Sequence, residues 1–327
     1  MRRGNLSADV LRWRSEGRAC ASPASVLGAP FDISLDWVQF SKVLPGVVAM
    51  NPPGVAGAET RKHGSEPLTV AQPFLIQQQW DAYTDEQHAV WAELVRRRMP
   101  QLREHAAEEY LNGFEQIGLR EDTIPDLADV NRRLGPRTGW NATPVSGFLP
   151  PDAFFEMLGA RQFPTTTYIR SREAMEYTPE PDIFHDVFGH VPMHAHPVFA
   201  DFLQHYGRVS AALMHDKEKL EKMGRLFWFT VEFGVIRQKG KVKLYGSGLI
   251  SSHGEGTHVI QGKPEIRDFN LEQVLEQRFL VSEEQKVLYA VESFDQIYEA
   301  AQEAEKRLGT GRPGSGASRG SGDTDLR

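Results

Sequence analysis

Two histidines and one glutamate are the residues of this chain whose types and spacing could hold a metal ion. His185 and His190 lie five positions apart in an apolar segment, and Glu232 follows within Phe-Thr-Val-Glu-Phe-Gly. Two imidazoles and one carboxylate on one face of a metal, with the other coordination positions open, form the ligand set of non-haem Fe(II) oxygenases. The alternative is that both histidines are hydrogen-bonded core or surface residues, because the chain contains eleven histidines.

The five-residue spacing is unusual for ligands on an α-helix. At about 3.6 residues per turn, residues five apart lie about 140° apart around the axis, whereas residues four apart lie about 40° apart. A regular helix would therefore point His185 and His190 in different directions. Gly189 and Pro192 stand where such a helix could loosen or end, and we expect this to let both rings converge.

The segments around these residues resemble the signature of one enzyme family. The similarity runs from roughly residue 75 to residue 300, in the family's order and spacing. On these motifs the chain is identified as a member of the pterin-dependent aromatic amino acid hydroxylases. The motifs are Tyr-Thr-Pro-Glu-Pro-Asp at 177–182, His-Asp at 185–186, Gly-His-Val-Pro at 189–192, Trp-Phe-Thr-Val-Glu-Phe-Gly at 228–234, Tyr-Gly-Ser-Gly-Leu-Ile-Ser-Ser at 245–252 and Tyr-Ala-Val-Glu-Ser-Phe at 289–294.

The resemblance implies a fold and a metal centre. The fold would be mostly α with minor β and would consist of a single aromatic amino acid hydroxylase catalytic domain. The enzyme would use O₂, with Fe(II) and a tetrahydropterin as cofactors. Hydroxylation of an aromatic ring by O₂ needs electrons and a dioxygen-binding centre that side chains cannot supply, and the pterin would provide two electrons. His185, His190 and Glu232 would hold the iron, and Ser251 would hydrogen-bond His185 to fix its orientation.

The resemblance also implies a pterin site. Phe154 would stack on the planar ring system, and the main chain from Gly147 to Leu149 would hydrogen-bond its edge. Asp186 stands where many family members have glutamate, and it would contact the pterin through water. From the residues alone, Phe154 beside Phe155 is more typical of a hydrophobic core.

The substrate site follows from the same resemblance. Arg170 would bind the carboxylate of an amino acid bidentately, a geometry that suits the guanidinium group. Its neighbour Arg172 is interpreted as a surface residue. The other implied substrate contacts are Thr178, Pro181, Trp228, Gly248 and Val281.

Val281 bears on which aromatic amino acid is hydroxylated. An apolar residue there resembles the phenylalanine enzymes, whereas an acidic residue would indicate tyrosine hydroxylation. The resulting hypothesis is a phenylalanine 4-monooxygenase, with a tyrosine or tryptophan hydroxylase as the alternative. A pterin-binding or amino-acid-binding protein without catalysis would be favoured by loss of a ligand, and all three ligands are present. A zinc peptidase would require His-Glu-x-x-His, which is absent.

The composition excludes several classes of protein. A net charge of −7 argues against nucleic-acid binding, and we expect the basic run Arg96-Arg97-Arg98 to lie on a solvated helix face. Cys20 is the only cysteine, so an intramolecular disulfide is excluded. No apolar stretch approaches 18 residues and the start lacks a signal peptide, so we expect a cytoplasmic protein without a membrane span.

Three segments are expected along the chain: a poorly ordered arm over residues 1–70, the catalytic domain over 71–308, and a flexible Gly/Ser-rich tail over 309–327. The tail contains no heptads, whereas animal members of the family add a C-terminal oligomerising helix. We therefore expect a monomer whose partners are small molecules.

Hydrophobic periodicity and turn residues predict the elements of the catalytic domain. A capping box at Thr84 to Gln87 indicates the start of one helix. The segment 226–236 mixes aromatic and β-branched residues, and its pattern does not decide between helix and strand. The other expected elements are helices over 105–114, 125–134, 199–213, 217–223 and 271–279, a loop over 144–151 and a strand over 242–245.

Overall fold

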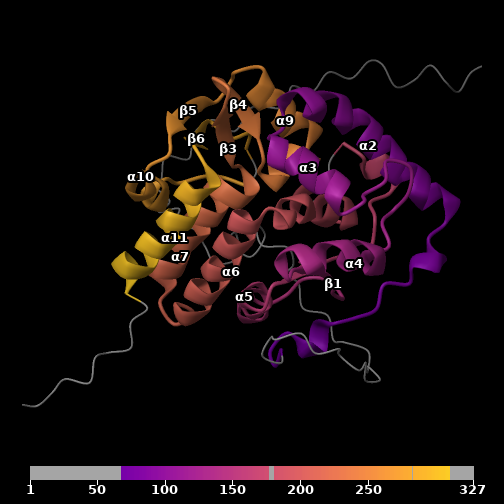
Figure 1. The fold of residues 1–327 in the computed structure, drawn as a ribbon, viewed down its shortest axis with the longest axis horizontal. Coiled ribbons are helices and arrows are strands. Elements are labelled where there is room, and N and C mark those ends of the chain that lie inside the picture. The colour runs from indigo at the N-terminus through magenta and orange to yellow at the C-terminus, as the bar shows by residue number, and fades with distance from the viewer. Residues whose placement is uncertain (1–67, 177–179, 282, 310–327) are drawn as a thin grey trace, which may run out of the picture. The chain divides into compact units, whose positions relative to one another are not determined.

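The structure is a computed structural model that describes residues 68–176, 180–281 and 283–309. The predictions for residues 1–67 and 310–327 lie outside these ranges. Helices dominate the described part of the chain, and the strands are few and short, which confirms the predicted fold class of mostly α with minor β (Figure 1). No described helix is both long and apolar enough to cross a membrane.

The strands form two small sheets. In the first, two strands pair in parallel: β1 (Asn141–Pro144) and β2 (Gln162–Thr165). In the second, the order is β4-β3-β6-β5, with β3 and β4 antiparallel and the other neighbours parallel. Its strands are β3 (Val235–Gln238), β4 (Lys241–Leu244), β5 (Glu265–Asp268) and β6 (Val287–Val291).

The first helices begin where their capping residues predict. The capping box of Thr84 and Gln87 is formed at the start of α2 (Asp85–His105). Asp126 caps α4 (Leu127–Thr138), which therefore begins two residues after Pro125. Arg98 in α2 contradicts the prediction of a solvated basic face, because its side chain is buried among other elements.

One predicted helix start is wrong by three residues. Helix α3 spans Glu108–Gln116, whereas the pattern predicted a start at residue 105. Ala106 instead forms a bridge with Leu244, and the Ala107 N–H donates to the Leu244 carbonyl at 2.8 Å. The Ala107 N–H therefore bonds to the edge strand β4 between the end of α2 and the start of α3.

The later helices pack on one another and on the sheet. Figure 1 shows α5, α6, α7 and α11 gathered together, and α6 contacts each of the other three. Helix α10 ends three residues before its predicted end at 279, and α7 continues four residues beyond its predicted end at 223. These helices are α5 (Pro151–Gly159), α6 (Pro197–Ala212), α7 (Lys217–Phe227), α8 (Ser247–Ser251), α9 (His253–Ile260), α10 (Leu271–Glu276) and α11 (Phe294–Leu308).

Short helical turns complete the chain, and two of them are π-helices. Segment η4 (Phe184–His190) begins two residues after the motif at 177–182 and contains the His-Asp motif at 185–186, and η6 (Trp228–Glu232) continues directly from α7. Residues 226–236, which the sequence pattern left undecided, thus contain the end of α7, η6 and the start of β3. The 3₁₀ turns are η1 (Gln72–Phe74), η2 (Trp80–Ala82), η3 (Arg172–Ala174) and η5 (Val191–Ala195).

Segment η4 lies at the centre of the hydrophobic core. Phe184 and Phe188 stack on each other with ring centroids 4.5 Å apart. Trp91 from α2 packs edge-on against both rings, and Tyr110 and Phe114 from α3 contact Phe188. Because large aromatic side chains bury much apolar surface, this cluster holds the histidine-bearing segment rigidly.

Candidate metal centre

The two histidines converge because they lie on a π-helix. In a π-helix the hydrogen bonds run from i to i+5, so residues five apart lie above one another. The Nε2 atoms of His185 and His190 are 3.2 Å apart. The expectation that the helix departs from α-helical geometry and lets both rings converge is therefore confirmed. The departure is a π-helix over the whole of η4, which runs through Gly189 and ends at His190, two residues before Pro192.

Glu232 completes the group from the end of the second π-helix. Its Oε1 lies 3.2 Å from His190 Nε2, and its Oε2 lies 3.8 Å from His185 Nε2. One potential ligand atom from each of the three residues lies within 4.8 Å of the other two. Among the described residues, these three form the cluster of His, Cys, Asp or Glu side chains that could hold a metal ion. Both π-helices thus serve to bring ligands to one point.

The protonation states of His185 and Glu232 suit the binding of a cation. Burial lowers the pKa of His185 to about 4, so its imidazole is neutral at pH 7. Burial acts to raise the pKa of Glu232, but His190, His185 and a hydrogen bond from Ser247 outweigh it and hold the pKa below its usual value. Neutral imidazoles and an ionised carboxylate are the forms that bind metals.

Two serines of α8 form hydrogen bonds with two of the candidate metal ligands. Ser251 Oγ lies 2.9 Å from His185 Nδ1 and donates to the Ser247 carbonyl at 2.8 Å, so it accepts from an N–H at Nδ1. This tautomer leaves the Nε2 lone pair of His185 for the metal. Ser247 Oγ donates to Glu232 Oε2 at 2.7 Å.

Ser247 was missed by the sequence interpretation. The available signal was its position in Tyr-Gly-Ser-Gly, four residues and one helical turn before Ser251. That spacing places both hydroxyls on the same side of a helix, and one of the two was already assigned to a ligand.

Glycines let α8 approach the ligand-bearing segments closely. A Cβ atom at Gly246 would lie 2.3 Å from the Gly234 nitrogen and 2.5 Å from the Glu232 carbonyl oxygen. A Cβ at Gly248, an implied substrate contact, would lie 3.1 Å from that same oxygen. A Cβ at Gly189 would lie 3.1 Å from the Ser247 carbonyl oxygen. The close packing fixes α8 against both π-helices.

Asp186, the implied pterin contact, is buried directly beside His185. Its Oδ2 accepts from the Thr166 N–H at 2.8 Å and from the Thr166 hydroxyl at 2.7 Å. Its Oδ1 has no hydrogen-bond partner among the described residues, and burial raises its pKa to about 7. A buried acidic oxygen without a partner is the kind of atom that a cofactor or an ordered water would satisfy.

The other implied pterin residues are placed differently from one another. The main-chain N–H groups of Gly147 and Leu149 donate to no described residue. Phe154 is fully buried in α5 and packs edge-on against Phe155 and Phe227, at 5.6 and 6.1 Å. In this arrangement the Phe154 ring is packed as a core residue. To stack on a pterin, one face of the ring would first have to be uncovered by movement of the side chains around it.

Arg170, the implied carboxylate clamp, already holds a buried carboxylate. Its Nε and Nη2 donate to Asp182 at 2.8 and 2.7 Å, and its main-chain N–H donates to the same side chain. Asp182 in turn accepts from the His185 N–H at 3.1 Å. Asp182 therefore links the arginine to the start of the π-helix that carries both histidines, while Arg170 Nη1 donates to no described residue.

Among the remaining implied substrate contacts, Trp228, Pro181 and Val281 are described by the structure and Thr178 is not. Trp228 is buried and stacks on Phe279, with centroids 4.2 Å apart and planes 8° apart. The Pro181 carbonyl accepts from the Tyr168 hydroxyl at 2.6 Å. Val281 is 41% exposed, and Thr178 lies outside the described residues.

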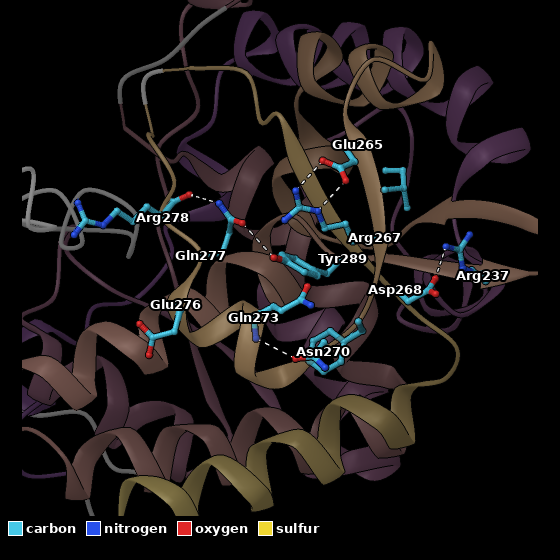
Figure 2. Close-up of a pocket in the computed structure, with 12 residues that line it drawn as sticks. Arg237, Glu265, Arg267, Asp268, Asn270, Gln273, Glu276, Gln277, Arg278 and Tyr289 are labelled. Carbon is cyan, nitrogen blue, oxygen red and sulfur yellow. Dashed lines mark hydrogen bonds and ion pairs between the residues drawn. The ribbon is translucent and has the colours of Figure 1, made fainter.

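A separate polar hollow lies beside β5 and α10, and Figure 2 shows its lining. Within it, Arg267 pairs with Glu265 at 2.8 Å and Arg237 pairs with Asp268 at 2.7 Å, so opposite charges neutralise each other locally. None of the three metal ligands lines this hollow. The candidate chemistry therefore belongs to the His-His-Glu group.

Comparisons with known proteins identify relatives of the chain. Residues 46–310 match the family described as biopterin-dependent aromatic amino acid hydroxylase, and this match begins upstream of the boundary predicted at residue 71. Phenylalanine-4-hydroxylase of Mesorhizobium japonicum is 39% identical over 237 residues, which cover 71% of this chain and 84% of that protein. Tyrosine 3-monooxygenase of Canis lupus familiaris is 42% identical over 216 residues, covering 65% and 43%.

A solved structure agrees with this match. The phenylalanine hydroxylase of Chromobacterium violaceum, with bound iron(III) and the oxidised cofactor 7,8-dihydrobiopterin, has a TM-score of 0.68 against this chain. The two sequences are 36% identical, and the alignment covers 73% of this chain and 88% of that one.

Proposed function

This chain belongs to the biopterin-dependent aromatic amino acid hydroxylases, and we propose that its substrate is L-phenylalanine, which it converts to L-tyrosine with O₂ and a tetrahydropterin. The observation that supports hydroxylation at an iron centre is the convergence of His185, His190 and Glu232 on one point from two π-helices. Such a ligand set leaves several coordination positions open, as an oxygenase requires.

The residues of the chain would hold and orient the reactants. When bound, the iron would supply the site for O₂ chemistry and the tetrahydropterin would supply two electrons. Ser251 keeps His185 in the tautomer that offers Nε2, and Ser247 orients Glu232. Asp186 retains one carboxylate oxygen for a water or for the pterin. The main-chain N–H groups of Gly147 and Leu149 would bind the pterin edge.

Arg170 would bind the carboxylate of the amino acid. Asp182 holds its Nε and Nη2, which fixes the plane of the guanidinium group and leaves Nη1 for a second anion. A guanidinium group that is oriented in advance loses less conformational entropy when a ligand binds. Trp228 would form one wall of the pocket for the aromatic ring, with Phe279 supporting it from behind.

The choice of phenylalanine rests on Val281 and on the relatives. A phenol hydroxyl that reaches an apolar side chain loses its hydrogen bonds to water without replacement. Several bacterial relatives are phenylalanine-4-hydroxylases at 34–39% identity. Tyrosine hydroxylation is the second candidate, because the tyrosine 3-monooxygenase match has the higher identity over a shorter stretch.

A comparison of substrates tests the proposal. The Fe(II)-loaded protein is supplied with a tetrahydropterin and O₂, and kcat/KM is measured for phenylalanine, tyrosine and tryptophan in turn. We expect the highest value for phenylalanine, and we expect Val281→Asp to shift the preference toward tyrosine by roughly tenfold, because the new carboxylate can accept from the phenol. Higher kcat/KM for tyrosine or tryptophan in the unaltered protein would overturn the proposed substrate.

Loss of the histidines tests the metal centre. His185→Ala and His190→Ala each remove one of three ligands, so we expect at least a 10–100-fold loss of iron affinity and of turnover. Circular dichroism of the metal-free variants provides the folding control. Full iron content and activity in either variant would exclude that residue as a ligand.

A further inference from the structure

The described part of the chain contains a buried cation that has no carboxylate partner there. Arg98 lies in the middle of α2, and its side chain is 1% exposed. Burial lowers its pKa to about 10, so the group is still protonated at pH 7. Removal of a charge from water costs several kcal/mol unless other interactions compensate.

The compensating contacts are made mainly to the end of α8. Arg98 Nε donates to the Ile250 carbonyl at 2.8 Å, and Nη2 donates to the Leu249 carbonyl at 2.9 Å. Nη1 donates to Gln101 Oε1 at 2.5 Å. The last carbonyls of a helix lack partners within that helix, and α8 ends at Ser251. Arg98 thus caps α8 from another helix with charge-assisted hydrogen bonds.

The capped helix is the one that supports the metal ligands. Ser251 directly follows Ile250 and contacts His185, while Ser247 at the start of α8 contacts Glu232. Because α8 has five residues, a shift at its end displaces both hydroxyls. We propose that Arg98 is a positioning residue of the metal centre, which fixes α8 so that its two serines hold His185 and Glu232 in their ligating orientations.

The shape of the neighbouring helix supports this role independently. A Cβ atom at Gly256 in α9 would lie 2.5 Å from Arg98 Nη2 and 2.7 Å from the Leu249 carbonyl oxygen. The guanidinium group therefore occupies a slot that exists because position 256 is glycine. Gln101 extends the contact by donating to Thr257 Oγ1 at 3.2 Å. Helices α2, α8 and α9 are joined around one side chain.

Metal affinity tests the proposal without any substrate or pterin. The metal-free protein is titrated with Co(II), and its visible absorption reports both the affinity and the ligand geometry. We expect Arg98→Met to bind Co(II) roughly 10–100-fold more weakly and to show an altered absorption spectrum. Substitution of residues that orient metal ligands typically has an effect of this size. The control is Arg96→Gln, which removes an exposed arginine paired with Glu93 on the same helix and should bind as the unaltered protein does.

A double variant separates positioning from general stability. If Arg98 acts through α8, both Arg98→Met and Ser251→Ala disrupt the same support of His185. The double variant should then bind Co(II) only slightly more weakly than the weaker-binding of the two single variants. Losses that multiply would overturn the proposal, as would an affinity within twofold of the unaltered protein in Arg98→Met. A purely structural role would lower the melting temperature and leave the Co(II) spectrum of the folded protein unchanged.

A second variant decides the matter if Arg98→Met does not fold. Gly256→Ala keeps the charge but places a methyl group in the slot, so it should weaken Co(II) binding in the same way. Gly254→Ala in the same helix is the control, because the nearest atom to its Cβ, Ser252 Oγ, lies 4.0 Å away. Equal Co(II) affinities in the two alanine variants would overturn the proposal. Since no amino acid is present, these results do not depend on which substrate is hydroxylated.

Discussion

Arg170 has a structural role in addition to the substrate-binding role proposed for it. The ion pair with the fully buried Asp182 anchors the start of η4, while the proposed substrate contact would use the remaining N–H groups. The sequence motif implied the second role. The first could not be predicted, because the partner lies twelve residues away and nothing in the sequence fixes which of several carboxylates it meets.

Removal of the Arg170 side chain should affect one substrate selectively. A lost charge-assisted contact is worth about 1.5–3 kcal/mol, so Arg170→Ala should raise KM for phenylalanine by roughly 10–150-fold with little change in KM for the pterin. Steady-state kinetics with each substrate varied in turn measures this. Arg172→Ala, which removes a half-exposed arginine paired with Glu86, is the control. An unchanged KM for phenylalanine in Arg170→Ala would exclude the clamp.

Glu255 gives a pH-dependent prediction at the same scale. Burial raises its pKa from 4.5 to about 7, and its Oε2 has no partner among the described residues. The folded state therefore favours the protonated form, and stability falls as the pH rises from about 4.5 to 7. We expect Glu255→Gln to increase the free energy of unfolding at pH 8 by about 1 kcal/mol, and to have no effect at pH 4.

Urea denaturation at both pH values measures this difference. The control is Glu303→Gln on the exposed face of α11, where the carboxylate pairs with Arg307 and the pKa is lowered instead. That variant should not gain stability at pH 8. A Glu255→Gln variant whose stability relative to the unaltered protein is the same at both pH values would contradict the prediction.

At the scale of elements, the π-helices were the features that sequence patterns could not predict. Periodicity of about 3.6 identifies α-helices such as α2, and the capping box at Thr84 set its start correctly. A five-residue spacing of histidines conflicts with that period, and the conflict itself was the signal of a wider turn in η4. Such a turn is stabilised by packing of distant segments, including Trp91 and Ser247, which a local pattern does not contain.

The packing of α8 against η6 gives the prediction at this scale. Gly246→Ala would force a methyl group to within 2.5 Å of the Glu232 carbonyl oxygen, so the two segments must separate. We expect a loss of about 1–3 kcal/mol in the free energy of unfolding, accompanied by weaker metal binding. Thermal melting with and without Co(II) measures both effects.

A glycine within α4 provides the matched control. A Cβ at Gly135 meets its nearest neighbour at 3.8 Å, which is ordinary contact, so Gly135→Ala should be neutral or stabilise by about 0.4–1 kcal/mol. Equal destabilisation by the two substitutions would show that the loss of glycine matters in general, and that the contact between α8 and η6 does not limit stability.

At the scale of the whole molecule, contacts between segments that are distant in sequence determine which arginine of a basic run is buried, and the sequence pattern does not predict this. Arg96, Arg97 and Arg98 are adjacent and identical in type, yet Arg98 is buried against Leu249 and Ile250, more than 150 residues along the chain. No property of the basic run distinguishes its last member. The metal ligands could be predicted, in contrast, because their types and the motifs around them mark them directly.

The oligomeric state gives the last prediction. Residues 310–327 are rich in Gly and Ser and lack the repeating apolar positions of a coiled coil, so we expect a monomer. The last helix, α11, buries Ile297, Ala301 and Ala304 within its own chain and ends at Gly309 in a left-handed conformation. Truncation after Gly309 therefore leaves the helix and its end intact. The mass in solution, by light scattering, and the turnover should both stay unchanged, whereas a tetramer that dissociates on truncation would show that the tail mediates assembly.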